Sequence, residues 1–127
     1  MADVLFVEDD DVVREVFALG LRQAGFAVSE ERFAEGALHS LDRCAPDLLL
    51  LDIGMPPGEM SGLELLVRLR ETDRWRHLPV IVLSGFGNHI NLDIMARLGV
   101  SAVLTKAEVT GLDVARRVEE ALMLSNR

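Results

Sequence analysis

The amino-acid sequence predicts an α/β protein with a doubly wound, five-stranded parallel sheet between two layers of helices. Short apolar clusters recur along the chain, segments with helical periodicity separate them, and two of the clusters are continuously apolar. A continuously apolar strand is typical of a parallel sheet that is covered on both faces. Five strand and helix units in 127 residues favour an open sheet over a barrel, which needs eight.

The strands are predicted from clusters of apolar and β-branched residues. The clusters read VLFV, FAVS, LLLL, VIVL and AVLT, at residues 4–7, 26–29, 48–51, 80–83 and 102–105. The third and fourth contain no polar residue, so we expect these two strands to be buried on both faces.

A helix is predicted after each strand, because apolar residues recur there at intervals of three and four. Gly25 ends the first helix and Gly99 the fourth, and the second must end before Pro46. Ser61 is a candidate cap for the third. The helical patterns cover residues 13–24, 34–41, 63–70, 90–98 and 112–122.

Length and composition predict one compact domain over residues 1–127, with half of the residues hydrophobic. The net charge of −8 argues against direct binding to nucleic acid and suits proteins or small cations as partners. Cys44 is the single cysteine, which excludes an internal disulfide. The sequence shows no leader pattern and no membrane-spanning run, so we expect a cytoplasmic protein that does not enter a membrane.

Polar residues follow four of the predicted strands. Glu8 and Asp9 follow the first, Asp52 the third, Ser84 the fourth and Lys106 the fifth. The carboxyl ends of parallel strands meet at one edge of the sheet, so these side chains are predicted to share a site. Three carboxylates at one point repel one another unless a cation neutralises them, and hard oxygen ligands suit Mg²⁺. The sequence therefore predicts a Mg²⁺ site.

The neighbouring Asp10 and Asp11 are predicted to face outward at the start of the first helix, where negative charge is favourable. Capping of that helix would explain these two residues without a metal. It would not explain Asp52, although a single Asp can also be an ordinary turn residue. Beside Mg²⁺, the Asp52 carboxylate could attack a phosphoryl group. Lys106 would then neutralise the phosphoryl oxygens and Ser84 would donate a hydrogen bond to one of them.

Four segments, VLFVEDD, PDLLLLDIGMP, PVIVLSG and GVSAVLTK, resemble in order and spacing the receiver domains of two-component response regulators, over essentially the whole chain. The resemblance implies a flavodoxin-like receiver fold with strand order 2-1-3-4-5. It implies that a histidine kinase or phosphotransfer protein phosphorylates Asp52 and that the signal passes on through contacts with a downstream protein. It also implies roles for five other groups: Glu8 and Asp9 as the acidic pair, the Gly54 carbonyl as a Mg²⁺ ligand, Ser84 as switch hydroxyl and Lys106 as phosphate contact.

Three departures of the sequence from the receiver pattern concern the connections and the strand around the predicted site. The segment DIGMPPGEMSG is about two residues longer than the usual connection after the phosphoacceptor. Ala107 replaces a proline that usually has a cis peptide bond, so we expect a trans bond there. Val103 stands where the family carries an aromatic switch residue, and Phe86 with its flanking glycines offers a substitute.

Two other functions are alternatives to phosphorylation at Asp52. A receiver-like module that signals without phosphorylation is favoured by Val103 and Ala107 and disfavoured by the intact polar set. A phosphatase of the haloacid dehalogenase kind needs a second Asp two residues after the nucleophile, where this chain has Gly54. It also needs a cap domain, for which the length is insufficient.

The remaining polar and aromatic side chains are interpreted as surface groups. None of the three histidines stands in a motif with an acidic partner, and Trp75 is expected to lie half covered over a loop. Solvated side chains are expected for His39, His77, His89, Arg68, Arg70, Arg74 and Arg76.

Overall fold

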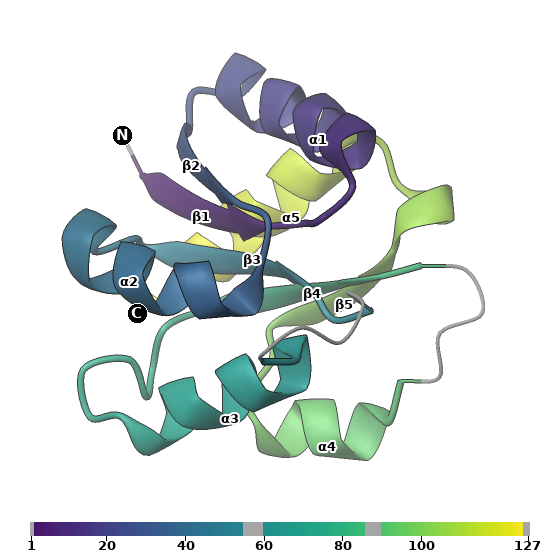
Figure 1. Ribbon diagram of the computed structural model, residues 1–127. Coiled ribbons are helices and arrows are strands. Elements are labelled where there is room, and N and C mark those ends of the chain that lie inside the picture. Colours follow the sequence, from purple (N-terminus) through teal and green to yellow (C-terminus); the bar gives the residue numbers. More distant parts are fainter. Residues whose placement is uncertain (1, 55–59, 86–89, 126–127) are drawn as a thin grey trace.

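The computed structural model describes residues 2–54, 60–85 and 90–125. Its sheet has five parallel strands in the order β2-β1-β3-β4-β5, which confirms the predicted fold (Figure 1). The strands are β1 (Asp3–Val7), β2 (Ala27–Glu31), β3 (Leu48–Asp52), β4 (Val80–Ser84) and β5 (Ala102–Thr105).

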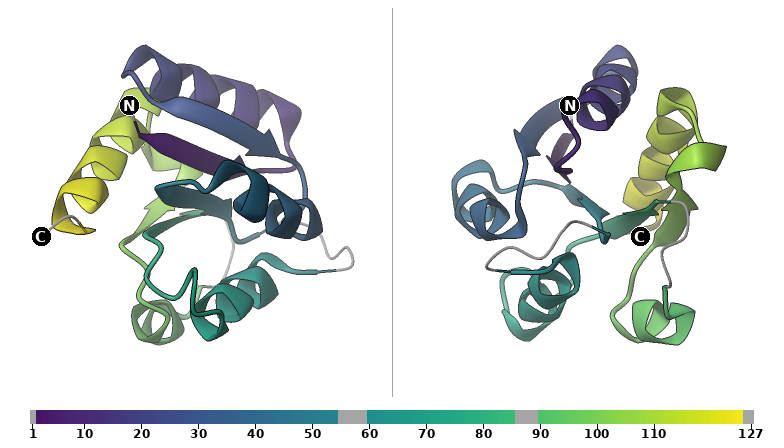
Figure 2. Two further views of the ribbon diagram at one scale, coloured as in Figure 1. Left: turned by 90° about the vertical axis from the view of Figure 1, so that its left-hand side faces the viewer. Right: turned by 45° about the vertical axis from the view of Figure 1, so that its right-hand side comes forward.

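Helices cover both faces of the sheet. Figures 1 and 2 show α1 and α5 on one face and α2, α3 and α4 on the other. Among the described residues, no helix combines the length and the apolar character needed to cross a membrane. The helices are α1 (Asp11–Gln23), α2 (Ala34–Cys44), α3 (Gly62–Glu71), α4 (Leu92–Arg97) and α5 (Gly111–Ser125), with a short 3₁₀ helix, η1 (Lys106–Glu108).

The core consists of two apolar layers, because successive side chains of a strand point to opposite faces. In β3, Leu49 and Leu51 pack toward α2 and α3, whereas Leu48 and Leu50 pack toward α1 and α5. Every residue of β3 and β4 is buried. This confirms the interpretation of the two continuously apolar clusters as strands covered on both sides.

Most predicted elements differ from the structure by one to three residues at an end, and two of these differences have a clear physical reason. The strand predicted at 26–29 instead runs to Glu31, because β2 is an edge strand whose backbone pairs with β1 while its side chains stay partly exposed. The helix predicted at 90–98 begins only at Leu92, because the Asn91 side chain accepts a hydrogen bond from the Ile94 amide and caps it. The short helix η1 has no counterpart among the predicted elements.

The predicted surface residues agree with the structure except for Arg70. His39 and His77 are exposed, whereas His89 lies outside the described residues. Trp75 is half-buried against the core, as expected. The prediction of a solvated Arg70 is wrong, because its side chain is partly buried and donates hydrogen bonds to backbone carbonyls of two connections.

The backbones of helices α1 and α5 come close together at two glycines. A Cβ atom added to Gly20 would lie 2.7 Å from the Cα and carbonyl carbon of Gly111. Both neighbours of such a Cβ are backbone atoms, which cannot turn aside as a flexible side chain can. The absence of a side chain at Gly20 therefore sets the spacing of the two helices on this face.

We expect Gly20→Val to lower the free energy of unfolding by about 1–3 kcal/mol, because an overpacked contact forces the backbones apart. Urea denaturation measures this change. The matched control is Gln23→Val on the exposed side of the same helix, which should change stability by about 0.5 kcal/mol or less. Equal stabilities of the two variants would contradict the close approach.

Candidate functional site

The acidic residues predicted to share a site meet at the carboxyl edge of the sheet. Strands β1 and β3 are neighbours, with Val7 opposite Leu51, so the residues that follow them stand side by side. One carboxylate oxygen from each of Glu8, Asp9 and Asp52 lies within 4.8 Å of the others. The predicted convergence of the three carboxylates is therefore present.

Lys106 completes this cluster from the far side of β4. Its Nζ lies 2.5 Å from Glu8 Oε1 and 3.0 Å from Asp52 Oδ2, so one ammonium contacts two carboxylates. The Lys106 side chain is 19% exposed, and Lys106 is the only lysine in the chain. This ion pair connects the ends of β1, β3 and β5.

Burial sets the protonation of the cluster. Glu8 and Asp52 are buried, whereas Asp9 is partly exposed. Burial raises the pKa of Glu8 to about 8, and a hydrogen bond with Asp52 acts in the same direction against the opposing effect of Lys106. Burial lowers the pKa of Lys106, but its contacts with Glu8 and Asp52 outweigh burial and leave that pKa above its usual value. One ammonium thus does not neutralise the carboxylates fully.

The Asp52 carboxylate is oriented by its own backbone. Its Oδ1 accepts a hydrogen bond of 2.9 Å from the Gly54 amide, and its Oδ2 faces Lys106. On the neighbouring strand, Ser84 ends β4 and is buried. Because Asp52 pairs with Leu83, Ser84 is one position further toward the carboxyl edge.

Asp10 and Asp11 lie outside the cluster, as predicted. Asp10 Oδ1 accepts hydrogen bonds from the amides of Val12 and Val13 and caps α1. Asp11 is exposed, and its hydrogen bond with Arg14 holds the pKa of Asp11 below its usual value. The acidic run at residues 8–11 therefore divides into two inward carboxylates and two that start a helix.

The sequence analysis did not identify Arg14, whose side chain contacts the backbone of Glu8. Its guanidinium donates a 2.7 Å hydrogen bond to the Glu8 carbonyl and also pairs with Asp11 and Glu30. The spacing of Asp11 and Arg14 signals their helical pair, but the contact with Glu30 depends on the pairing of β1 with β2. Arg14 therefore positions the backbone that carries Glu8.

The departures from the receiver pattern have different outcomes. All described peptide bonds are trans, so the bond between Lys106 and Ala107 is trans as expected. Val103 is partly buried and packs on the face covered by α3 and α4. Residues 55–59 of the lengthened segment DIGMPPGEMSG and the candidate Phe86 lie outside the described residues.

The cluster has the chemistry of a site for a hard divalent cation. Its donors are carboxylate oxygens only, and two of the three carboxylates are buried, where uncompensated charge is costly. The residues that could hold the cation are Glu8, Asp9 and Asp52. The Asp52 carboxylate, which also contacts Lys106, could act as a nucleophile toward phosphorus.

Comparison with known proteins gives one consistent family. The family model described as "Response regulator receiver domain" matches residues 4–119. An uncharacterized 14.6 kDa protein of Leptolyngbya boryana is 35% identical over 118 residues, covering 93% of this chain and 88% of that protein. The transcriptional regulatory protein CseB of Streptomyces coelicolor is 39% identical over 119 residues, covering 91% of this chain and 49% of CseB. The chain thus spans about half the length of CseB.

Solved structures show the same fold. The crystal structure of NtrX from Brucella abortus superposes with a TM-score of 0.87 at 29% sequence identity. The match covers 98% of this chain and 28% of the NtrX chain. The likeness is therefore to one part of a longer protein.

The raised pKa of Glu8 makes stability depend on pH. Glu8 binds a proton with a pKa of about 8 in the folded protein and near 4.5 in the unfolded chain. The folded state therefore holds the extra proton between these values, and its stabilising effect is lost as the pH rises from 4.5 to 8. The side chain of Glu8→Gln is neutral at every pH. We therefore expect the stability of metal-free Glu8→Gln not to fall in this way as the pH rises.

Urea unfolding in EDTA between pH 5 and pH 9 measures the free energy of unfolding of both proteins. The stability of Glu8→Gln relative to wild type should rise up to about pH 8 and then stay constant. Asp11→Asn is the matched control. Because the pKa of Asp11 lies below 3.8, its curve should run parallel to that of the wild type over this range. Parallel curves for Glu8→Gln as well would contradict the protonation described for the cluster.

Proposed function

This chain belongs to the response regulator receiver domain family, and we propose that its Asp52 accepts a phosphoryl group in a Mg²⁺-dependent reaction. Receiver domains are signalling domains of two-component systems. The observation that carries the proposal is the double contact of Lys106 with Glu8 and Asp52, in a cluster with Asp9. This arrangement unites a nucleophile, cation ligands and a fixed positive charge.

The proposed reaction is a phosphoryl transfer to a carboxylate. A bond forms between an oxygen of Asp52 and phosphorus, while the bond from phosphorus to the donor breaks and the donor leaves with its electron pair. The Gly54 amide holds Oδ1 of Asp52, which leaves Oδ2 as the attacking atom. A carboxylate nucleophile, unlike a hydroxyl, needs no general base to remove a proton.

Glu8, Asp9 and Asp52 would hold the Mg²⁺, together with the carbonyl of Gly54 that the family resemblance indicates. A bound Mg²⁺ supplies positive charge to the phosphoryl oxygens during transfer. The carboxylate of Glu8, which carries a proton near neutral pH in the metal-free protein, would release that proton when it becomes a ligand.

Lys106 and Ser84 would act on the transferred group. The Lys106 ammonium, already 3.0 Å from Asp52 Oδ2, can contact a phosphoryl oxygen bonded at that position. Ser84, buried on the neighbouring strand, can donate a hydrogen bond to another oxygen. Since Val103 carries no ring, the response of β5 to phosphorylation would involve repacking against α3 and α4 rather than movement of an aromatic side chain.

We propose a histidine kinase or phosphotransfer protein as the phosphoryl donor and a downstream protein as the receiver of the signal. The net charge of −8 favours protein contacts over direct contact with nucleic acid. Residues 1–127 would act as a single receiver domain. A cytoplasmic site of action is in keeping with the lone Cys44, which has no disulfide.

The alternative of a module that signals without phosphorylation is less well supported. Keeping Glu8 and Asp52 buried beside each other costs free energy that an apolar pair would not. A domain that only binds a partner gains nothing from this cluster. A partner that binds wild type and Asp52→Asn equally would nevertheless favour that alternative.

Incubation with acetyl phosphate and Mg²⁺ should add one phosphoryl group, which intact mass spectrometry detects. EDTA or Asp52→Asn should abolish the gain, because each removes a necessary part of the site. Asp10→Asn is the matched control, since asparagine also caps helices and Asp10 lies outside the cluster. An unchanged mass in folded wild-type protein that binds Mg²⁺ would contradict the proposal.

Replacing Lys106 with methionine should slow phosphorylation of Asp52 by roughly 10²-fold, the usual effect of losing one charged contact to a transition state. Timed quenching and mass spectrometry measure the rate. Lys106→Arg keeps the positive charge but places it on a guanidinium of different shape, so it should be phosphorylated faster than Lys106→Met and more slowly than wild type. Circular dichroism establishes that both variants fold, and equal rates for folded wild type and Lys106→Met would contradict the role of the ammonium.

A further inference from the structure

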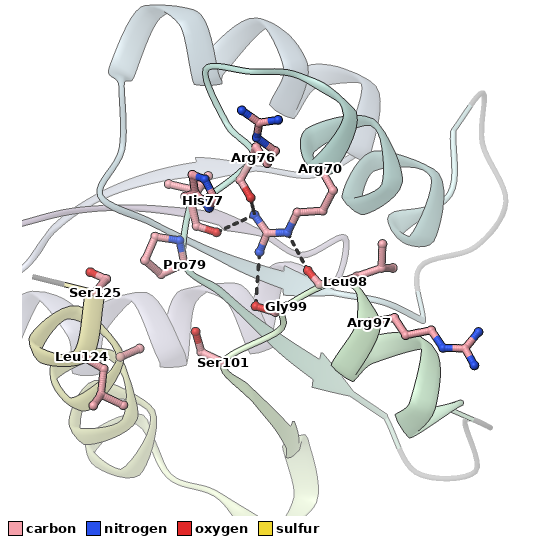
Figure 3. A pocket seen from close by; sticks show the side chains of 12 residues that line it. Arg70, Arg76, His77, Pro79, Arg97, Leu98, Gly99, Ser101, Leu124 and Ser125 are labelled. Carbon is pink, nitrogen blue, oxygen red and sulfur yellow. Dashed lines mark hydrogen bonds between the residues drawn. The ribbon is translucent and has the colours of Figure 1, made fainter. Parts of the chain in front are cut away.

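A cavity of about 530 Å³ opens at the edge of the sheet opposite the acidic cluster. It lies where the chain enters β4 and β5, beside the last turn of α5 (Figure 3). The described residues that line it include no Asp or Glu but four basic ones: Arg70, Arg76, His77 and Arg97. We call it the arginine cavity. In a chain with a net charge of −8, it is a local surface of the opposite sign.

Arg70 lies at the centre of the cavity, and its charge has no acidic partner in the described part of the chain. Its Nε donates to the Leu98 carbonyl at 2.6 Å, and Nη2 makes one long contact of 3.4 Å with the Gly99 carbonyl. A guanidinium has five N–H groups, two of them on Nη2, so one Nη2 hydrogen is left over. Burial without a counter-ion lowers the pKa of Arg70. The Nη1 group donates to the carbonyls of Trp75, Arg76 and Leu78.

Two further arginines stand at the rim of the arginine cavity. Figure 3 shows the side chains of Arg76 and Arg97 pointing away from Arg70, toward solvent. Arg76 has a long contact of 3.6 Å with the exposed Asp73, and Arg97 has no ion pair among residues 2–54, 60–85 and 90–125. Exposed contacts of this kind are weak. Both side chains are therefore available to an incoming anionic group.

The lining of the arginine cavity also includes apolar residues. Leu78, Pro79 and Leu98 line it on the side of the sheet, and Leu124 lines it from the end of α5. Leu124 is 64% exposed, so apolar surface beside the cavity is in contact with water. The combination suits a ligand that has carboxylates and an apolar group together.

We propose that the arginine cavity docks an acidic segment of a partner protein, with carboxylate side chains next to an apolar one. The carboxylates would pair with Arg76 and Arg97 and reach the spare N–H of Arg70, while the apolar side chain would cover Leu124. The negative charge of the rest of the molecule repels an acidic segment, so attraction is confined to this edge. The proposal goes beyond the phosphorylation of Asp52 and does not depend on it.

The first experiment uses the full chain and a short fluorescein-labelled peptide of repeated Glu-Glu-Leu. The matched control peptide has Gln in place of Glu. Fluorescence anisotropy at low salt should show binding about tenfold tighter for the Glu peptide, and the difference should shrink at high salt because the contacts are exposed. Equal affinities of the two peptides would overturn the proposal.

The second experiment places the peptide in the cavity. Combining Arg76→Gln with Arg97→Gln should weaken binding about tenfold, because two charge contacts are lost. Combining Arg68→Gln with Arg116→Gln is the matched control, since both side chains are exposed, neither lines the cavity, and the charge change is the same. Equal losses in the two double variants would mean non-specific attraction and would overturn the proposal.

Amide NMR shifts locate the site where the peptide binds. Binding of other ligands tests whether an acidic segment is the true occupant of the cavity. The Glu peptide should shift the resonances of Leu78, Gly99 and Ser101, and Leu124→Ser should reduce its affinity. Shifts confined to another surface would overturn the site. Tighter binding of oligothymidylate than of the peptide, or self-association of the chain that Arg97→Gln abolishes, would overturn the assignment to an acidic partner segment.

Discussion

The contact of the Lys106 ammonium with the carboxylates of Glu8 and Asp52 connects three strand ends that are far apart in sequence. Two buried carboxylates side by side are unfavourable, and an opposite charge within hydrogen-bonding distance reduces the cost. The ammonium can reach them only because β3, β4 and β5 are adjacent and parallel. The order of the strands and the chemistry of the site therefore depend on each other.

This electrostatic arrangement also explains why the cluster suits a cation. One ammonium does not neutralise the carboxylates, and burial together with the neighbouring Asp52 raises the pKa of Glu8. A divalent ion would supply the missing positive charge, and a phosphoryl group would then bring negative charge that the ion and Lys106 both offset. With the proposed function, the net charge of the site would change when the ion binds and again when the phosphoryl group is added.

Charge is distributed unevenly between the two edges of the sheet. The carboxyl edge carries the acidic cluster, whereas the amino edge at β4 and β5 carries the arginine cavity. Arg70 links the α3–β4 and α4–β5 connections through its hydrogen bonds to their carbonyls. A partner that binds at the amino edge would thus contact the same connections that hold the C-terminal end of α4.

Sequence patterns within single segments predicted most of the strands and the meeting of the acidic residues. Continuous apolar clusters predicted β3 and β4, because burial on both faces excludes polar residues, and the placement of Glu8, Asp52 and Lys106 after strands predicted their meeting. The same reasoning ended β2 two residues too early, because Glu30 and Glu31 are charged. An edge strand tolerates charged residues, since its side chains stay partly exposed.

By itself, the sequence determined the fold class, the order of the elements and the acidic site, because each depends on residue type and spacing along the chain. Tertiary structure alone decided the roles of Arg14 and Arg70. Arg14 pairs with Glu30 on a neighbouring strand, and Arg70 bonds to carbonyls that lie up to 29 residues away. Backbone carbonyls are present at every residue and leave no trace in side-chain patterns, so only the folded chain shows which of them an arginine reaches.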